Sequence, residues 1–418
     1  MVEIRLGSKM KELKNIVLIN DFDYVNGGTA QIAITTANAL SAMGYNIIFL
    51  SAVTEPKKDL VPGVLKINTG QYEILKDPNK LRAASQGVWN NTAAIALTKL
   101  LYSLDPRETI VHIHGWVKAL SSSIGKVLSV SRFPAVLTLH DYFIACPNGG
   151  FFNYRTNSIC QLKPMSIQCV CTNCDSRNFT HKSWRVLRQY VQNRAGHIPD
   201  GINNFISVTS FSEEILRPYL PKHAHIYRVT NPVNNPFAYP KRVNPSSGRL
   251  IYIGRLSPEK GITLACEAAR RSKSRMIVIG DGDLKKDLQE KYPEIEFKGW
   301  LPSSHVFEEM LTASALVFPS VLYETQGLAV SEAFSVGLPV IVSDKSAASE
   351  LVNFENGILF RSGDVSDLSA KMELMLADPK ALERRSINIF KTYWENPNTV
   401  KKYADQLLQV YENIINNN

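Results

Sequence analysis

Short apolar runs rich in β-branched residues alternate with amphipathic stretches from Ile16 onward. This alternation is typical of parallel sheets covered by helices, because a strand buried on both faces is apolar throughout while a covering helix is apolar along one side. In the first half of the chain the pattern predicts strands at 16–20, 46–50, 64–67, 110–114, 135–139 and 205–208, and helices at 29–43, 92–101 and 181–194.

A segment without periodicity, from Asn231 to Gly248, ends this series and is rich in Pro, Asn and Ser. A second series follows, with strands predicted at 250–253, 276–279, 295–298, 315–318, 340–343 and 358–360. The last segment repeats apolar residues at helical spacing. We therefore predict an α/β fold of two facing Rossmann-like doubly wound domains with a cleft between them. The predicted domains are 1–230 and 231–398, and a C-terminal helix at 399–418 is expected to pack back on the first.

The length and composition agree with two soluble domains. A chain of 418 residues exceeds the size at which one core keeps growing. The amino-terminal MVEIRLGSKMKELKN is polar where a secretory signal is apolar, and no apolar run approaches the ~20 residues of a membrane span, so we expect a cytoplasmic protein. The formal net charge of +9 favours an anionic partner, whether a nucleotide diphosphate, a lipid surface or nucleic acid.

Two cations flank a predicted helix start in the second half. Arg255 and Lys260 lie on either side of Ser257 and Pro258, which suit the cap and first turn of a helix. Free N–H groups and the helix dipole attract anions at such an end, so the two cations could neutralise a diphosphate there. An ordinary charged surface loop has the same composition.

Two carboxylates, Glu324 and Glu332, stand eight positions apart around a second predicted helix start near Gly327. Glu324 lies in the loop before the helix and Glu332 more than one turn inside it. One carboxylate can then reach a sugar hydroxyl while the other reaches a ribose, with the free N–H groups of the helix directed at the phosphates between them.

These segments together resemble family 4 glycosyltransferases, which have the two-domain GT-B fold, a retaining mechanism and no metal requirement. The resemblance rests on the Gly-Arg-Leu-x-x-x-Lys-Gly segment at 254–261, the two glutamates, and Gly-Leu-Pro-Val at 337–340, in that order. It implies transfer of a sugar from a nucleoside diphosphate to a saccharide or lipid-linked saccharide in cell-surface polysaccharide synthesis. We expect a uridine diphosphate sugar because such donors are prevalent.

The resemblance also implies a role for particular residues. Arg255 and Lys260 would hold the donor diphosphate, Glu332 the ribose and Glu324 the transferred sugar. The remaining donor contacts implied are the backbone at Gln326, Gly327 and Leu328, the glycine turn at Gly280 and Gly282, and the base-reading segment at Phe297, Gly299 and Trp300. Gln326 stands where many relatives have an apolar residue, which leaves the donor sugar open.

In the first half, Gly27 and Gly28 lie between the first strand and helix, where glycine lets backbone approach a ligand closely. The resemblance implies that this loop approaches the donor phosphate and the acceptor. It also implies that His140, at the end of the strand 135–139, is a cleft histidine near the reacting sugar. His114 and His112, with Trp116, are weaker candidates for the acceptor side. No residue qualifies as a nucleophile, so stabilisation of the departing diphosphate is expected to carry catalysis.

Five of the six cysteines fall between Cys146 and Cys174. In a cytoplasmic chain such crowding favours metal ligation over disulfides, and Cys171 and Cys174 have the spacing of a zinc knuckle. The sequence therefore predicts a structural zinc held by Cys146, Cys160, Cys171 and Cys174 in an insertion at about 142–180, with reduced thiols as the alternative.

Other interpretations remain open at this stage. A metal-dependent transferase would use an acidic pair such as Asp21 and Asp23, which is unconvincing here, and a sugar-nucleotide epimerase or a phosphorylase could share the fold. A zinc-containing nucleic-acid-binding protein is disfavoured because no arginine-rich run occurs. An anionic membrane surface is a further possible partner, contacted by the helix 181–194 through the residues Lys182, Trp184, Arg185, Arg188 and Arg194.

Overall fold

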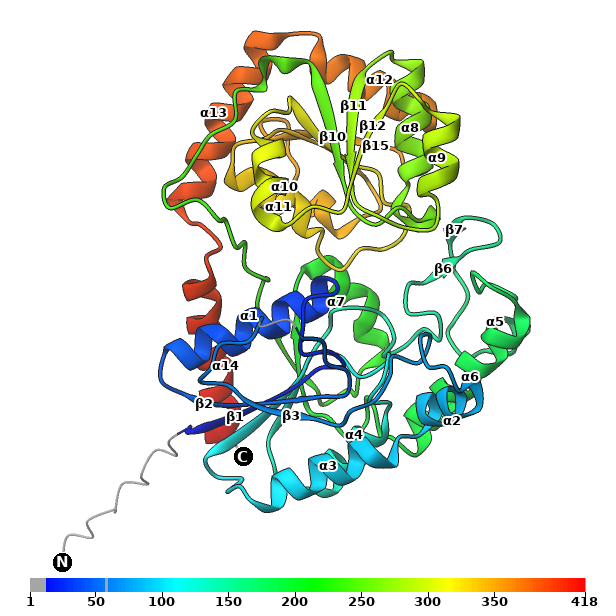
Figure 1. Ribbon diagram of the computed structural model, residues 1–418, viewed down its shortest axis with the longest axis vertical. Helices are drawn as coiled ribbons and strands as arrows, with labels where there is room; N and C mark the ends of the chain where they lie inside the picture. The colour runs from blue at the N-terminus through cyan, green and yellow to red at the C-terminus, as the bar shows by residue number, and fades with distance from the viewer. Residues whose placement is uncertain (1–12, 57–58, 418) are drawn as a thin grey trace, which may run out of the picture.

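The apolar runs become the central strands of two parallel sheets. The computed structural model describes residues 13–56 and 59–417, so the polar amino-terminal segment lies largely outside the described residues. Each predicted strand coincides with a strand of the structure to within about a residue at each end. Figure 1 shows two lobes, the lower built by the first half of the chain and the upper by the second. The predicted α/β class with two doubly wound parallel sheets is confirmed.

The lower lobe contains a seven-stranded parallel sheet in the order β3-β2-β1-β4-β5-β8-β9. Its strands are β1 (Asn15–Ile19), β2 (Asn46–Ser51), β3 (Leu65–Asn68), β4 (Thr109–Ile113), β5 (Ala135–Thr138), β8 (Asn204–Ser207) and β9 (His225–Arg228). Its helices are α1 (Gly28–Ala42), α2 (Lys80–Val88), α3 (Asn91–Tyr102), α4 (Ser123–Val130), α6 (Phe179–Arg194) and α7 (Ser210–Leu216). The cysteine-rich insertion adds a hairpin of β6 (Phe152–Asn153) and β7 (Ser158–Ile159), followed by α5 (Ile167–Cys171).

The upper lobe contains a six-stranded parallel sheet in the order β12-β11-β10-β13-β14-β15. Its strands are β10 (Arg249–Ile253), β11 (Arg275–Ile279), β12 (Glu296–Gly299), β13 (Ala315–Phe318), β14 (Val340–Ser343) and β15 (Gly357–Phe360). Its helices are α8 (Ile262–Arg271), α9 (Lys285–Lys291), α10 (Ser303–Met310), α11 (Leu328–Ser335), α12 (Val365–Leu376) and α13 (Pro379–Glu395), with a short 3-10 helix at Pro258–Lys260. The strand order reverses direction at β10 and β13, which is where open α/β sheets bind ligands.

The last helix, α14 (Val400–Asn416), crosses from the upper lobe and packs on the lower one (Figure 1). Its apolar face joins the core cluster that contains Ile16 and Leu18 of β1. Two buried tyrosines fix it further, because Tyr403 Oη lies 2.9 Å from Thr36 Oγ1 and Tyr411 Oη lies 2.6 Å from His112 Nδ1. The chain therefore passes between the lobes twice.

Hydrogen bonds join the lobes at the loop between β13 and α11. Thr209 Oγ1 donates to the Thr325 carbonyl over 2.7 Å, and Thr325 Oγ1 donates to the His140 carbonyl over 3.0 Å. Tyr142 Oη donates to the Glu324 carbonyl over 3.2 Å. These contacts place the loop directly over the carboxyl ends of the lower strands. No helix among the described residues is long and apolar enough to cross a membrane.

Candidate active site between the lobes

Arg255, Lys260 and Glu324 meet at the carboxyl end of β10. Lys260 Nζ lies 2.6 Å from Glu324 Oε1, and Ser320 Oγ donates to the same oxygen over 2.5 Å. Arg255 Nη2 donates to Glu259 Oε1 over 2.5 Å, yet the Arg255 side chain stays 64% exposed. The structure thus brings the two predicted cations and the first predicted carboxylate together at a helix start, where they can receive a diphosphate and a sugar.

Helix α11 presents its amino terminus to the same place. Gly327, just before it, has a φ of 82°, and a Cβ there would lie 2.8 Å from the Ala348 Cβ, so a larger residue would strain the turn. No side chain caps this helix start, which leaves its N–H groups available to an anion. Glu332 lies one turn further along and is half-buried. Burial raises the pKa of the Glu332 carboxyl to about 7.

The loops that follow β10, β11 and β12 lie side by side. Gly254 N donates to the Ile279 carbonyl over 3.0 Å, and Gly280 N donates to the Gly299 carbonyl over 2.8 Å. Gly280 has a φ of 138°, and a Cβ on it would lie 1.9 Å from the Gly254 carbonyl oxygen, so only glycine fits between the loops. Trp300 is 71% exposed at the end of this row. The predicted base-reading and phosphate-binding segments therefore form one continuous edge.

On the lower lobe, Gly27 and Gly28 begin α1 opposite the start of α11. A Cβ on Gly28 would lie 3.9 Å from Leu328 Cδ1, and a Cβ on Gly27 would meet no atom within 4 Å. Leu328 packs against the core cluster of the lower lobe. Two helix amino termini from different lobes thus face each other across the site.

The histidines of β4 and of the loops after β4 and β5 form a neutral cluster, in which His112 and His114 are buried and His140 is half-buried. His114 Nδ1 lies 2.9 Å from His140 Nε2, and the rings are stacked. Burial lowers the pKa of His140 to about 3 and holds the pKa of His114 well below its ordinary value. His112 contacts Tyr411 and Thr138 through its two ring nitrogens, each at 2.6 Å, and is fully buried. The suggestion that His112 lines the acceptor side is therefore wrong, because it sits in the core.

The side chain of Gln326 points away from the donor loops. Its Nε2 donates to the Asn231 carbonyl and its Oε1 accepts from the Asn231 N–H, each over 3.3 Å. The amide thus ties the α11 loop to the first segment that connects the lobes. Only the backbone of Gln326 remains a candidate donor contact, because its side chain is engaged by the backbone of Asn231.

The predicted zinc site is not assembled. Within residues 13–56 and 59–417, no three His, Cys, Asp or Glu side chains come together in an arrangement that could hold a metal. Lys182, fully buried, places its Nζ 3.2 Å from Cys174 Sγ and 3.6 Å from Cys169 Sγ, whereas Cys171 is exposed. An ammonium group among thiols occupies the position that a cation would take. The prediction that Cys146, Cys160, Cys171 and Cys174 bind a structural zinc is therefore wrong.

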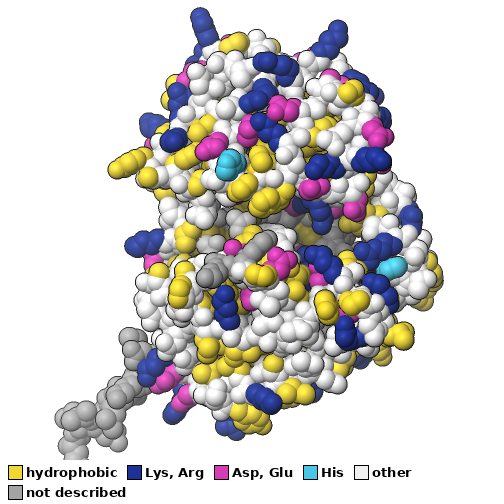
Figure 2. Space-filling model, viewed as in Figure 1, with side chains coloured by type: hydrophobic (Ala, Val, Ile, Leu, Met, Phe, Trp, Pro, Cys, Tyr) yellow, Lys and Arg dark blue, Asp and Glu magenta, His cyan; other side chains and the backbone are white. Residues whose placement is uncertain are grey.

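The basic face proposed for membrane contact is largely internal. Lys182 is fully buried, and Arg188 is 7% exposed and donates to the carbonyls of Val117 and Pro147. Burial lowers the pKa of Arg188 to about 9. Arg185 pairs with the buried Asp175 at 2.7 Å, and Trp184 Nε1 donates to the Ala84 carbonyl. Lys182 and Arg188 are therefore buried away from any bilayer, Trp184 and Arg185 are engaged within the lower lobe, and Arg194 at the end of α6 is exposed. On the viewed face, basic and acidic side chains are interspersed over both lobes (Figure 2).

Comparison with known proteins agrees with this geometry. The family model "Glycosyl transferases group 1" matches residues 247–378. Glycogen synthase of Mycobacterium tuberculosis (strain ATCC 25618 / H37Rv) is 25% identical over 408 residues, which is 88% of each chain. The GDP-mannose-dependent alpha-mannosyltransferase of Corynebacterium glutamicum is 29% identical over 191 residues, 44% of this chain and 45% of that one.

Solved structures share the fold. Sucrose-phosphate synthase of Thermosynechococcus elongatus aligns with a TM-score of 0.70 at 18% identity, covering 97% of this chain and 100% of that one. HepE of Anabaena in complex with UDP and glucose aligns with a TM-score of 0.64 at 14% identity, covering 96% and 100%. The resemblance to family 4 glycosyltransferases is thereby confirmed in the match of residues 247–378 to the group 1 glycosyl transferase model, and the whole chain shares the GT-B fold of the solved structures.

Proposed function

We propose that the protein is a retaining, metal-independent hexosyltransferase that moves a sugar from a UDP-sugar to a saccharide or lipid-linked saccharide during cell-surface polysaccharide synthesis. The observation that carries this proposal is the contact between Lys260 and Glu324 beside Arg255, opposite the start of α11. It offers positive charge for a diphosphate and a carboxylate for a sugar hydroxyl within one small volume.

Catalysis would rest on stabilising the leaving UDP. Arg255 and Lys260 would carry the diphosphate charge, and the N–H groups at the start of α11 would receive the phosphate oxygens, so no divalent ion is required for that task. Glu324 accepts from both Lys260 and Ser320, which orients it to bind a hydroxyl of the transferred sugar. His140, neutral because it is buried, can donate or accept a hydrogen bond to that sugar without bringing charge.

Among the residues that the structure describes, Glu324 is the carboxylate nearest to the proposed sugar position, and it is engaged by an ammonium group at 2.6 Å, which disfavours a role as a dedicated nucleophile. We propose that the acceptor hydroxyl attacks on the face from which UDP departs, which retains the anomeric configuration. In this scheme the departing phosphate takes the hydroxyl proton.

The two lobes would divide the substrates. Residues 231–398 would bind the nucleotide sugar, and residues 1–230 would bind the acceptor, with α14 as part of the second unit because it packs there. We propose a cytoplasmic protein that meets lipid-linked acceptors at the membrane face, by a surface other than the buried basic face of α6.

Donor-dependent stabilisation tests the proposal. A thermal-shift screen of UDP- and GDP-sugars should show preferential stabilisation by one UDP-sugar. The preferred donor should then release UDP faster when an acceptor is added, and NMR of the product should show the anomeric configuration of the donor. Preferential stabilisation by a GDP-sugar would overturn the donor assignment, and inversion at the anomeric carbon would overturn the mechanism.

A further inference from the structure

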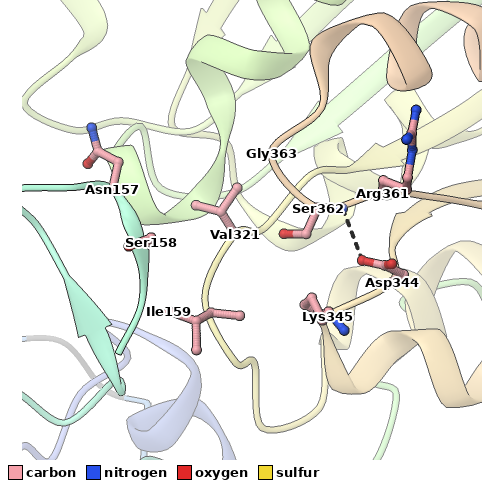
Figure 3. Close-up of a pocket in the computed structure, with 9 residues that line it drawn as sticks. All are labelled: Asn157, Ser158, Ile159, Val321, Asp344, Lys345, Arg361, Ser362 and Gly363. Atoms are coloured by element: carbon pink, nitrogen blue, oxygen red, sulfur yellow. Dashed lines mark hydrogen bonds between the residues drawn. The ribbon is translucent and has the colours of Figure 1, made fainter. Parts of the chain in front are cut away.

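A cavity of about 340 Å³ lies beside the donor site, between the insertion hairpin and the upper lobe (Figure 3). The hairpin contributes Asn157, Ser158 and Ile159, and the upper lobe contributes Val321, Asp344, Lys345, Arg361, Ser362 and Gly363. None of these residues has a part in donor binding as described above.

The upper-lobe residues of this cavity follow strands along one edge of the sheet. Val321 follows β13, Lys345 follows β14, and Ser362 follows β15. The proposed donor residues follow β12, β11, β10 and β13, so the cavity continues the same row of carboxyl-terminal loops from β13 to β14 and β15. Val321 joins the two regions directly, because its N–H donates to the Glu259 carbonyl over 3.0 Å and it lies three residues before Glu324.

The lining has the chemistry of a carbohydrate site. Ile159, Val321 and the hydroxyl of Ser362 point into the space between hairpin and lobe (Figure 3). Asp344 Oδ1 accepts from the Ser362 N–H over 3.0 Å. Apolar contacts can cover the C–H face of a sugar ring while amide, hydroxyl and carboxylate groups bind its hydroxyls.

The charges disfavour a second nucleotide. Arg361 lies 2.9 Å from Asp364 and 3.8 Å from Asp367, so its charge is met within its own loop. Lys345 and the neighbouring Asp344 bring opposite charges to the lining. A diphosphate would require an excess of positive charge, whereas a neutral or singly charged saccharide requires none.

The cysteine-rich insertion holds the hairpin in this position. Cys160 N donates to the Phe151 carbonyl over 2.7 Å, and Tyr154 N donates to the Cys174 carbonyl over 3.2 Å. Burial, and after it the charge of Glu259 in the donor loop, raises the pKa of Tyr154 in the hairpin turn to about 12. The buried Lys182 holds the C-terminal end of the insertion through its contact with Cys174. The insertion thus forms the wall of a space that opens beside the reacting sugar.

We propose that this cavity is an acceptor subsite, which binds a sugar unit of the acceptor saccharide beyond the unit that receives the transferred sugar. The proposal rests on the transferase function proposed above and specifies its acceptor class as an oligosaccharide of at least two units.

Immobilised oligosaccharides of one to four units, in neutral, uronic-acid and phosphorylated forms, test the subsite with the full chain in the presence of UDP. Ser362→Trp fills the cavity and Lys345→Ala removes its cation. Ser304→Trp and Lys286→Ala are matched changes at exposed positions of α10 and α9. We expect wild type to be retained by a subset of the longer saccharides, and the two cavity variants to bind that subset at least about tenfold more weakly. The two control variants should bind as wild type does.

The outcomes separate the subsite from the donor site. UDP should stabilise all five proteins equally, because neither Ser362 nor Lys345 belongs to the proposed donor site. Equal retention of Ser362→Trp and wild type on every saccharide would overturn the subsite, as would retention of wild type by no saccharide while UDP still binds. Loss of UDP stabilisation in the cavity variants alone would show that the cavity belongs to the donor site. If wild type is stabilised by no nucleotide sugar and transfers none, the proposed function itself fails.

Discussion

Replacing Glu332 with Gln should stabilise the free protein and weaken donor binding. The folded protein holds the Glu332 carboxyl at a pKa of about 7, against an ordinary value of 4.5, because the side chain is buried. Since the folded pKa is raised, the protonated form favours folding, and wild-type stability falls as the pH rises from about 4.5 to about 7. The amide carries no charge to bury, so the variant escapes this loss.

The expected difference follows from the pKa change. At about 1.36 kcal/mol for each pH unit between the two values, ionisation of Glu332 costs at most about 3 kcal/mol at pH 8 and under about 1 kcal/mol at pH 5. Urea unfolding of wild type and Glu332→Gln at both pH values measures this difference in the free energy of unfolding. Glu373→Gln, at an exposed position of α12, is the control and should change stability by less than about 0.5 kcal/mol.

Donor binding should change in the opposite direction. An ionised Glu332 accepts hydrogen bonds from ribose hydroxyls, so the UDP affinity of wild type should rise between pH 6 and pH 8. In Glu332→Gln the affinity should be independent of pH and about tenfold weaker at pH 8. Equal stability of the two proteins at pH 8 would refute the burial argument. An unchanged UDP affinity would refute the ribose contact.

Three further predictions concern the donor loop, the metal and the core. Lys260→Ala should lower kcat/KM for the nucleotide sugar about 10- to 100-fold through loss of its contact to the diphosphate, with the fold intact by circular dichroism, whereas the exposed Lys286→Ala should match wild type. Transfer should persist in excess chelator because Arg255 and Lys260 meet the phosphate charge, and loss of activity that magnesium or manganese restores would contradict this. Tyr411→Phe should destabilise the protein by about 1–3 kcal/mol in urea unfolding, since it leaves the buried His112 Nδ1 without its partner at 2.6 Å. Tyr102→Phe, at a position 88% exposed, should be neutral, and equal effects of the two substitutions would contradict the packing of α14 on the sheet.

All strands of the two parallel sheets except the edge strand β9 could be predicted from the sequence, because their signal is local. A run such as 315–318 is apolar at every position, and in an α/β chain only a central parallel strand is buried on both faces. The donor loops could be located for a related reason. Arg255, Lys260 and Glu324 each follow a strand, and the carboxyl ends of parallel strands lie on one edge, so sequence position already implies proximity.

Contacts between distant segments could not be predicted in this way. Gln326 bonds to Asn231, 95 positions earlier, and His112 bonds to Tyr411, 299 positions later. Neither contact can be recognised from hydrophobic periodicity or composition, because an amide and an imidazole are polar groups that a sequence pattern places on the surface. Their partners exist only once the two lobes and α14 have packed.

The cysteine-rich insertion shows most clearly the difference between what the sequence predicts and what only packing decides. Its crowded cysteines and the basic residues of 181–194 are plain in the sequence, and each set by itself suggests an external cation or an external anion. The tertiary structure brings the two sets together, because α6 turns Lys182 inward onto Cys169 and Cys174 and Arg188 inward onto backbone carbonyls. The sequence determined which charged and thiol groups the region contains. Only packing decided that these groups face one another, since the buried side of a helix depends on what covers it.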